Sequence, residues 1–309
     1  MSPSTSTPLR IGTRSSPLAL AQAEMTKAAL LAAHGWDDAA VILVPMLSGG
    51  DKVQDRPLAE IGGKALWTKE LERALLTREI DIAVHSMKDV ETLRADAFRI
   101  AAMLPRADVR DRLIGADSIA ALPHGARVGT SSPRRAAQLK ALRPDLVTAS
   151  IRGNVATRLS KLEHGEFDAT LLAAAGLDRL GQGHIGTAIA ASEMLPAAAQ
   201  GAIGIDCLSE RHELAALLDP VNHQPTFDCV MAERAFLEAL GGTCHSPIAA
   251  QASIDKGRIT LKAEILSEDG SEKRQGQTTF APADLVAPAR LARQLLDAAS
   301  PDLRALFGQ

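Results

Sequence analysis

A motif that occurs twice constrains the fold of this chain more than any other feature. Residues 127–135 read Arg-Val-Gly-Thr-Ser-Ser-Pro-Arg-Arg, and residues 10–18 read Arg-Ile-Gly-Thr-Arg-Ser-Ser-Pro-Leu, the same pattern with one inserted residue. In each copy an apolar strand-like run leads through a Gly-Thr turn to an alanine-rich helical pattern. The serine before the proline is predicted to cap the helix, and proline fits the first helical position, where a missing N–H costs no hydrogen bond.

Each copy of the motif predicts an anion site. A strand that leads into a capped helix N-terminus directs several backbone N–H groups at one point, with the positive end of the helix dipole behind them. The second copy adds Arg134 and Arg135. Two such sites in one chain indicate a ligand with many negative charges, bound between two related lobes.

The repeat continues beyond the motif. A helical pattern at 68–76 precedes the Asp-led strand pattern 79–84, and a helical pattern at 155–162 precedes the Asp-led strand pattern 166–171. Strands that alternate with helices favour an α/β fold with parallel sheets, in which ligands bind at the carboxyl ends of the strands. The alternative is a chance likeness between two ordinary strand–helix units.

The last third of the chain has a different pattern, that of a small α+β domain. We expect a helix over 228–240, a Gly-Gly-Thr-Cys-His-Ser-Pro loop, two strands and a C-terminal helix, the last three at 248–254, 258–266 and 282–299. A crossing segment is predicted near 105–112, and an apolar return strand follows Pro196. The expected domains are a first lobe of 1–104 with 197–218, a second lobe of 105–196, and a C-terminal domain of 222–309.

The composition is that of an ordinary globular protein, and it argues against some classes of binding partner. It has 309 residues, 46% hydrophobic and 23% charged, with a net charge of −3. This balance argues against a general nucleic-acid binder. No signal-peptide pattern or membrane-length apolar run is visible, and three cysteines without metal-ligand spacing suit a reducing compartment. We therefore expect a cytoplasmic protein without membrane or nucleic-acid partners and without a metal.

Charged residues gather after predicted strands. Lys88 and Asp89 follow a buried strand, where the alternative is a solvated surface ion pair. Arg152, Arg158 and Arg179 join Arg134 and Arg135 in the second lobe. Several guanidinium groups together favour a polycarboxylate, although arginines on helix faces are commonly only solvated.

Cys244 differs from the other two cysteines because it lies in the Gly-Gly-Thr-Cys-His-Ser-Pro loop. Cys207 and Cys229 are predicted to be buried as small apolar side chains. A thiol on a loop is a better candidate for covalent attachment. No Cys-His-Asn arrangement accompanies it, so the residues favour an attachment point over a hydrolytic nucleophile.

The chain resembles the hydroxymethylbilane synthase (porphobilinogen deaminase) family over nearly its whole length. The matching blocks follow the family's order: Gly12–Leu20, Gly62–Leu71, Asp81–Asp89, Val128–Ser132, Arg152–Asn154, Ala174–Leu177, Gln200–Ala202 and the cysteine loop. The resemblance implies two similar lobes like those of periplasmic binding proteins and a small α+β domain that carries the cysteine. It also implies a monomer.

The activity that this resemblance implies is a transfer reaction of tetrapyrrole (haem) biosynthesis. Four porphobilinogen molecules are condensed head to tail, with loss of ammonia, into hydroxymethylbilane. The primer is a dipyrromethane cofactor held by a thioether, here to Cys244. Because each pyrrole carries an acetate and a propionate, the anion sites suit this ligand.

The resemblance also assigns roles to individual residues. Asp89 is the expected catalytic carboxylate, which stabilises the cation left when ammonia departs and moves protons as the carbon–carbon bond forms. The cofactor-binding residues are expected to be Lys88, Ser86, Thr130, Ser131, Ser132, Arg134, Arg135 and Arg158. The substrate-binding residues are expected to be Arg14, Ser16, Gln22, Arg152 and Arg179.

Four positions depart from the family pattern, and none is a charged site residue. Glu91 stands where proline is common, and Ala199 stands where glycine is common. Gly49 and Trp67 lie in or beside a polar, glycine-rich stretch at 48–64 that is predicted to form a lid loop.

The best alternative from another class is a non-catalytic, two-lobed binding protein for a polycarboxylate. Such a protein would usually be exported and would need no cysteine loop. A nucleotide-dependent enzyme is disfavoured because no Gly-x-x-x-x-Gly-Lys-Ser/Thr run is present. A metal enzyme is disfavoured because the eight histidines are scattered.

Overall fold

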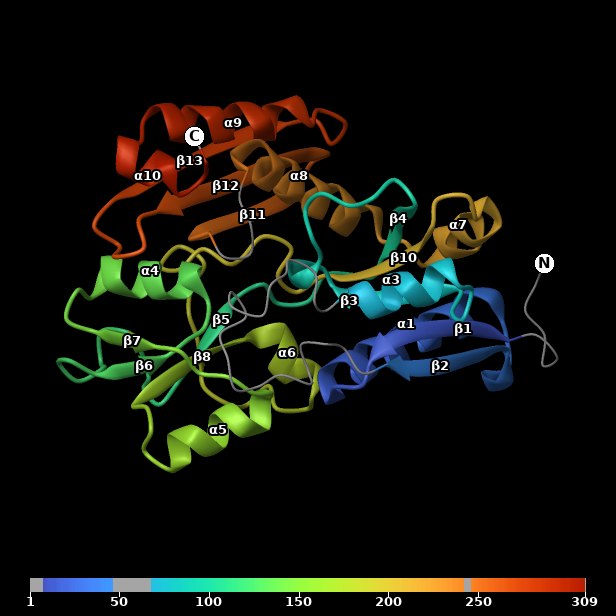
Figure 1. Ribbon diagram of the computed structural model, residues 1–309, viewed down its shortest axis with the longest axis horizontal. Helices are drawn as coiled ribbons and strands as arrows, with labels where there is room; N and C mark the ends of the chain where they lie inside the picture. Colours follow the sequence, from blue (N-terminus) through green and yellow to red (C-terminus); the bar gives the residue numbers. More distant parts are fainter. Residues whose placement is uncertain (1–7, 47–67, 242–245, 309) are drawn as a thin grey trace. The chain divides into compact units, whose positions relative to one another are not determined.

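The computed structural model describes residues 8–46, 68–241 and 246–308 (Figure 1). The chain forms two compact units. Unit 1 comprises Met1–Ala107 with Ala202–Phe227, and unit 2 comprises Asp108–Gly201 with Asp228–Gln309. The lid stretch at 48–64 and Cys244 lie outside the described residues.

Unit 1 contains a five-stranded sheet in the order β2-β1-β3-β10-β4. Three neighbouring strands, β2, β1 and β3, are parallel, and β10 runs antiparallel to both β3 and β4. The strand expected after Pro196 is β10, and it lies in this first sheet. The strands are β1 (Leu9–Arg14), β2 (Val41–Met46), β3 (Ile82–Ser86), β4 (Phe98–Met103) and β10 (Ile203–Leu208).

The described helical elements of unit 1 lie between these strands along the chain or follow the last of them, β10. They are α1 (Pro17–His34), η1 (Asp38–Ala40), α3 (Lys69–Leu76), η3 (Met87–Asp89), α7 (His212–Leu218) and η4 (Asp219–Val221), and α8 (Gln224–Leu240) leads from unit 1 into unit 2. The core of the unit is built from apolar side chains of the central strands, such as Ile11, Ile82 and Ile205, all fully buried. Cys207 belongs to this core, as predicted.

Unit 2 contains a second five-stranded sheet with the equivalent order, β7-β6-β8-β5-β9. Again three neighbouring strands are parallel, and one strand, β5, is antiparallel to both its neighbours. The strands are β5 (Asp111–Ile114), β6 (Arg127–Gly129), β7 (Val147–Ala149), β8 (Ala169–Ala173) and β9 (Thr187–Ala188), with helices α4 (Pro133–Leu142), α5 (Val155–Glu163) and α6 (Ala174–Arg179).

The sequence repeat is thus a structural repeat, with one correction. The expected parallel sheets are mixed, because one strand of each sheet, β10 or β5, runs antiparallel to both its neighbours. Equivalent contacts occur in both units. The Asp81 carboxylate accepts from the Arg10 backbone N–H at 2.9 Å. The Asp168 carboxylate accepts from the Arg127 backbone N–H at 2.6 Å.

Both predicted helix caps are present. The Ser16 hydroxyl accepts from the Ala19 backbone N–H at 3.4 Å, and the Ser132 hydroxyl accepts from the Arg135 backbone N–H at 3.4 Å. A proline occupies the first turn of each helix. These caps leave the remaining N–H groups of the first turn directed beyond the carboxyl ends of β1 and β6.

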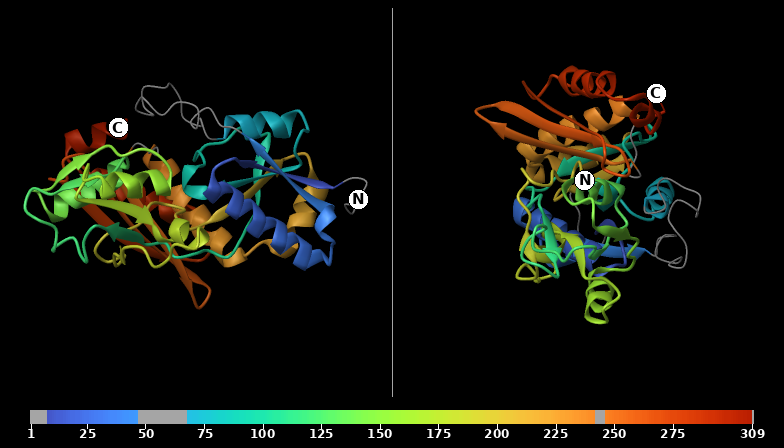
Figure 2. Two further views of the ribbon diagram at one scale, coloured as in Figure 1. Left: turned by 90° about the horizontal axis from the view of Figure 1, so that it is seen from below. Right: turned by 90° about the vertical axis from the view of Figure 1, so that its left-hand side faces the viewer.

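Unit 2 also holds the C-terminal sheet, in the antiparallel order β11-β12-β13. The strands are β11 (Ile248–Asp255), β12 (Arg258–Leu266) and β13 (Lys273–Phe280), and α9 (Val286–Asp297) and α10 (Pro301–Ala305) complete the chain. Helix α9 packs against β13 and β12 (Figures 1 and 2). Their shared core includes Phe236, Leu291 and the predicted buried Cys229.

Two expectations for this region need correction. Strand β13 was not predicted, because its exposed, polar Lys-Arg-Gln-Gly-Gln-Thr-Thr run carries no apolar pattern. The single helix expected over 282–299 is shorter, and a second helix follows it after Ser300. Within the residues that the structure describes, no helix has the length and apolar character needed to cross a membrane.

Candidate active site

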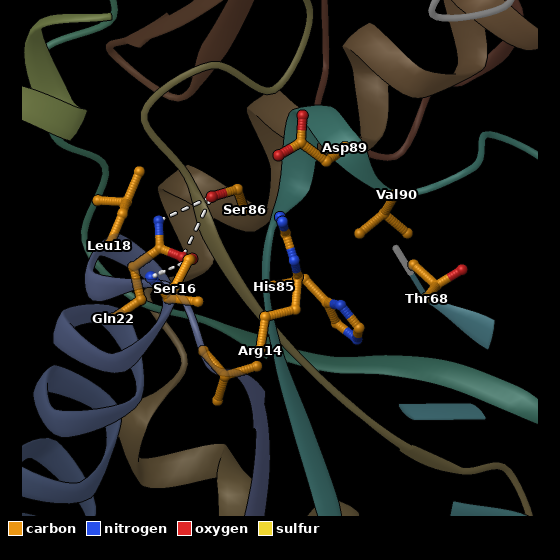
Figure 3. A pocket seen from close by; sticks show the side chains of 11 residues that line it. Arg14, Ser16, Leu18, Gln22, Thr68, His85, Ser86, Asp89 and Val90 are labelled. Atoms are coloured by element: carbon orange, nitrogen blue, oxygen red, sulfur yellow. Dashed lines mark hydrogen bonds between the residues drawn. The ribbon is translucent and has the colours of Figure 1, made fainter. Parts of the chain in front are cut away.

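Unit 1 contains a pocket at the carboxyl ends of β1 and β3, where α1 begins (Figure 3). About 440 Å³ of open space lies between the lining residues, and this space is continuous with solvent. Five residues to which the sequence assigned a role line it together: Arg14, Ser16, Gln22, Ser86 and Asp89. The remaining lining residues are Leu18, Ala19, Thr68, Val84, His85 and Val90.

Parallel pairing brings these residues together. Strands β1 and β3 are neighbours, so the residues that end them, Arg14 and Ser86, lie at one edge of the sheet. The Ser86 hydroxyl accepts a hydrogen bond from Gln22 Nε2 at 2.8 Å and lies 3.1 Å from Gln22 Oε1. This contact joins the first turns of α1 to the end of β3, so the wall of the pocket is preformed.

Asp89 ends the short 3₁₀ helix η3, immediately after β3. Its side chain is exposed, and among the described residues its carboxylate has no hydrogen bond or ion pair. Figure 3 shows the Arg14 guanidinium directed toward the side of the pocket that carries Asp89. An available carboxylate in a pocket can attract a positively charged group and hold it in a fixed orientation.

In unit 2, the predicted site residues follow three neighbouring parallel strands. Thr130, Ser131 and Ser132 follow β6. Arg152 follows β7, and Arg179 ends the helix that follows β8. The Ser131 hydroxyl donates to the Ile151 carbonyl at 2.6 Å, which joins the first two of these loops.

Arg134 and Arg135 are buried, and both bind Asp111. Arg134 Nη2 donates to Asp111 Oδ2 at 2.8 Å, and Arg135 Nη2 donates to Asp111 Oδ1 at 2.7 Å. Burial alone would raise the pKa of Asp111, but the charges and hydrogen bonds of the two arginines lower it well below its usual range. Burial lowers the pKa of Arg134, and Asp111 partly offsets this effect. The charge of the nearby, buried Glu264 also favours the charged form of Arg134.

Asp111 was not identified from the sequence, because it lies 23 residues before Arg134. No local pattern signals such a contact. It also accepts a hydrogen bond from Gln200 Nε2 at 2.9 Å. Gln200 in turn donates to the Val109 carbonyl at 2.7 Å, so this amide joins the segment before β10 to the segment before β5.

The Arg-Gly-Asn turn leads into α5 as predicted. Asn154 caps the helix by accepting from the Thr157 backbone N–H at 3.0 Å. Gly153 has a φ of 107°, and a Cβ there would lie 2.5 Å from the Thr157 side chain, so the turn requires glycine. Arg158 Nε donates to the Gly153 carbonyl at 2.9 Å. Arg152 is half-buried and, among the described residues, makes no side-chain hydrogen bond or ion pair.

Arg179 is held at the end of α6. Its Nη2 donates to the Gly201 carbonyl at 2.6 Å, and its Nε is buried without a partner among the described residues. Burial lowers the pKa of this guanidinium to about 10, and the nearby charge of Asp178 partly offsets the effect. A partly buried cation with an unsatisfied, buried donor favours an anionic ligand.

Comparison with known proteins identifies the family. The model of the porphobilinogen deaminase dipyrromethane cofactor binding domain matches residues 9–216, and the C-terminal domain model of the same family matches residues 227–296. The porphobilinogen deaminase of Sphingopyxis alaskensis is 57% identical over 306 residues, which cover 97% of this chain and 96% of that protein. The porphobilinogen deaminase of Paracoccus denitrificans is 51% identical over 273 residues, 87% of each chain.

The chain therefore belongs to the porphobilinogen deaminase family, as its motifs predicted. The similarity to solved structures is much weaker. A TRAP periplasmic solute binding protein from Desulfovibrio salexigens has a TM-score of 0.41 and 12% identity, over 71% of this chain and 73% of that one. The periplasmic VFT2 domain of Bordetella pertussis BvgS has a TM-score of 0.38 and 14% identity, over 69% of this chain and 86% of that one.

The residues of unit 2 fit the family's dipyrromethane cofactor. Its carboxylates need cations and N–H donors, and the ends of β6, β7 and β8 supply both. Arg134, Arg135 and Arg179 each keep a buried Nε that has no partner among the described residues. Metal-binding clusters of three or more His, Cys, Asp or Glu are absent from the described ranges 8–46, 68–241 and 246–308.

Proposed function

We propose that this chain condenses four porphobilinogen molecules head to tail, with loss of ammonia, to give hydroxymethylbilane. The observation that carries the proposal is the pocket of unit 1, which brings Asp89 together with Arg14, Ser16, Gln22 and Ser86. Family membership supports the same reaction. A pocket with one available carboxylate and a guanidinium suits a substrate that carries acidic side chains and develops positive charge.

The roles of the pocket residues follow from their chemistry. Arg14 binds a substrate carboxylate, and Gln22 and Ser86 orient polar groups next to it. The Asp89 carboxylate stabilises the cation that forms when the carbon–nitrogen bond of the aminomethyl group breaks. In unit 2, Arg152 and Arg179 bind carboxylates of the substrate.

The cofactor supplies, when bound, the pyrrole chain to which the substrate units are joined. We propose that Cys244 holds it through a thioether. Lys88, Thr130, Ser131, Ser132, Arg134, Arg135 and Arg158, together with Ser86, bind its carboxylates. Arg134 and Arg135 are buried and hydrogen-bonded to Asp111, so their binding of a ligand depends on how Asp111 holds the two guanidinium groups.

The proposal extends to the setting in which the protein works. It acts as a cytoplasmic monomer and does not bind membranes or nucleic acid, which the net charge of −3 supports. Its domains are 1–104 with 197–218, 105–196 and 222–309. The three separate sheets of the structure support this division.

The intact mass of the purified protein tests the proposal. We expect an excess over the polypeptide equal to two porphobilinogen units less two ammonias, absent from Cys244→Ser and retained in Cys229→Ser, the matched control. Added porphobilinogen should then increase the mass of the unaltered protein further and release ammonia. Reversible binding of porphobilinogen without ammonia release would instead support the non-catalytic binding protein.

A further inference from the structure

His85 is a pocket residue to which the proposed reaction has so far given no role. It lies on β3, its side chain is nearly buried, and it lines the same pocket as Asp89. Figure 3 shows its imidazole beside the Arg14 side chain. Among the described residues, no group forms a hydrogen bond with its Nδ1.

The other ring nitrogen of His85 is next to a buried carboxylate. Asp206 Oδ2 on β10 lies 3.2 Å from His85 Nε2, and the Asp206 side chain is 0% exposed. In the antiparallel register His85 stands opposite Gly204, which has no side chain, and Asp206 is its diagonal neighbour. The register between β10 and β4 shifts at Ile205 and Asp206. Such irregularities often redirect side chains near active sites.

The carboxylate of Asp206 is shared with a cation. Arg94 Nη1 lies 2.5 Å from Asp206 Oδ2, and Arg94 Nη2 lies 3.2 Å from Glu72 Oε1. The Arg94 guanidinium also lies over the Phe98 ring, 5.3 Å from its centroid. His85, Asp206, Arg94 and Glu72 therefore form a connected chain of side chains, and His85 is the member of this chain that lines the pocket.

We propose that His85 is the general acid of this pocket and gives its Nδ1 proton to the departing amino nitrogen of porphobilinogen. This inference rests on the proposed function. The amino group binds in its neutral form beside Arg14. As the carbon–nitrogen bond breaks, its electron pair stays on nitrogen, and the Nδ1 proton is transferred to it. Ammonia leaves, the imidazole becomes neutral, and the methylene carbon keeps a positive charge that it shares with the pyrrole nitrogen.

The charges around His85 suit this role. Asp206 favours the imidazolium from β10, and Asp89 favours it from η3. Arg14, at the end of β1, and Arg94, beyond Asp206, oppose it, and Glu72 on α3 partly neutralises Arg94. After the transfer His85 regains a proton from solvent, while Asp89 keeps its charge for the carbon-centred cation.

The first test is the pH dependence of kcat for cofactor-loaded protein. For His85→Gln we expect kcat to fall by about 10²- to 10⁴-fold, the usual contribution of a general acid. The fall in activity at high pH should disappear from the profile. His34→Gln is the matched control, because His34 contacts the Leu217 carbonyl outside the pocket and should leave the profile unchanged.

Two further variants should move the profile in opposite directions. Asp206→Asn removes the charge that favours the imidazolium, so activity should be lost at a lower pH than in the unaltered protein. Arg94→Gln removes an opposing charge, so activity should persist to a higher pH. If these side chains had only a structural role, the two variants would not shift the pH of activity loss in opposite directions. The comparison between Asp206→Asn and Arg94→Gln can be made even if His85→Gln does not fold.

Histidine NMR of the loaded protein provides a readout that does not depend on turnover. The His85 ring signal is the one missing from His85→Gln, and its titration should coincide with the high-pH limb of kcat. The proposal would be overturned if kcat of His85→Gln still fell at high pH as in the unaltered protein. It would also be overturned if Asp206→Asn and Arg94→Gln shifted the pH of activity loss in the same direction. Failure of the unaltered loaded protein to release ammonia from porphobilinogen would instead overturn the proposed function, and His85's role with it.

Discussion

Glu233 accepts a hydrogen bond from the backbone N–H of Ala199, with 2.6 Å between Glu233 Oε2 and the nitrogen. Its other oxygen accepts from the Ala252 backbone N–H at 2.6 Å, and the glutamate is fully buried. Ala199 has a φ of 60°, in the left-handed region that disfavours side chains. A buried carboxylate on α8 thus fixes the segment before β10 in a strained conformation that glycine would adopt more easily.

Replacing Ala199 with glycine should therefore stabilise the protein. The left-handed conformation costs a residue with a Cβ about 1–2 kcal/mol, and the greater freedom of glycine in the unfolded chain offsets part of this. We expect Ala199→Gly to raise the free energy of unfolding by up to about 1 kcal/mol, measured by urea denaturation. Ala198→Gly, the control at a neighbour without a positive φ, should destabilise the protein. A lower free energy of unfolding for Ala199→Gly than for the unaltered protein would contradict the inference that the backbone at Ala199 is strained.

Asp111 should make the stability of the protein sensitive to acid. Its pKa is lowered in the folded protein by Arg134 and Arg135. The carboxylate therefore contributes its full stability above the unfolded pKa of about 3.9 and loses it as the pH falls toward the folded value. We expect Asp111→Asn to cost about 3–5 kcal/mol at pH 7, because two buried guanidinium groups lose their counter-charge.

Urea denaturation of both proteins from pH 7 down to pH 2 measures this effect. The difference between the unaltered protein and Asp111→Asn should be constant above about pH 4 and should shrink below it. A difference that does not change with pH would mean that packing, and not charge, is what Asp111 provides.

Asp89 should be needed for turnover and not for folding. Asp89→Asn keeps the shape of the side chain and removes the charge that stabilises the cation, so we expect kcat to fall by about 10²- to 10³-fold. The cofactor should remain attached, as judged by intact mass. Asp96→Asn, an exposed aspartate outside the pocket, is the control. Turnover of Asp89→Asn close to that of the control would exclude the catalytic assignment.

Arg179 should contribute mainly to substrate binding. Its partly buried guanidinium keeps a buried donor, Nε, without a partner among the described residues. A hydrogen bond to a charged group contributes about 1.5–3 kcal/mol, so Arg179→Gln should raise KM for porphobilinogen about 10- to 100-fold, with a smaller change in kcat. Arg127→Gln, at the amino end of β6 and exposed, should leave both constants unchanged. A KM for Arg179→Gln equal to that of the control would place Arg179 outside the site.

Local chemistry in the sequence was enough to predict much of this fold. The Ser-Ser-Pro motifs specify capped helices because serine and proline act on the backbone next to them, whatever the rest of the chain does. Buried apolar strands such as β3 and β8 were predicted for a similar reason. Strand β13 was missed because, as an exposed edge strand, it has no apolar pattern and depends on pairing with β12.

The candidate site also has features that local sequence predicts and features that depend on contacts between distant segments. The two Ser-Ser-Pro motifs, the Lys88-Asp89 turn and the family were predicted from local sequence, because they depend on residues close together in the chain. That Arg134 and Arg135 contact Asp111, and that His85 lies next to Asp206, is seen only in the folded chain. Both contacts involve the antiparallel strand of a sheet, β5 or β10, and such pairings depend on the register between distant segments, which no local propensity encodes.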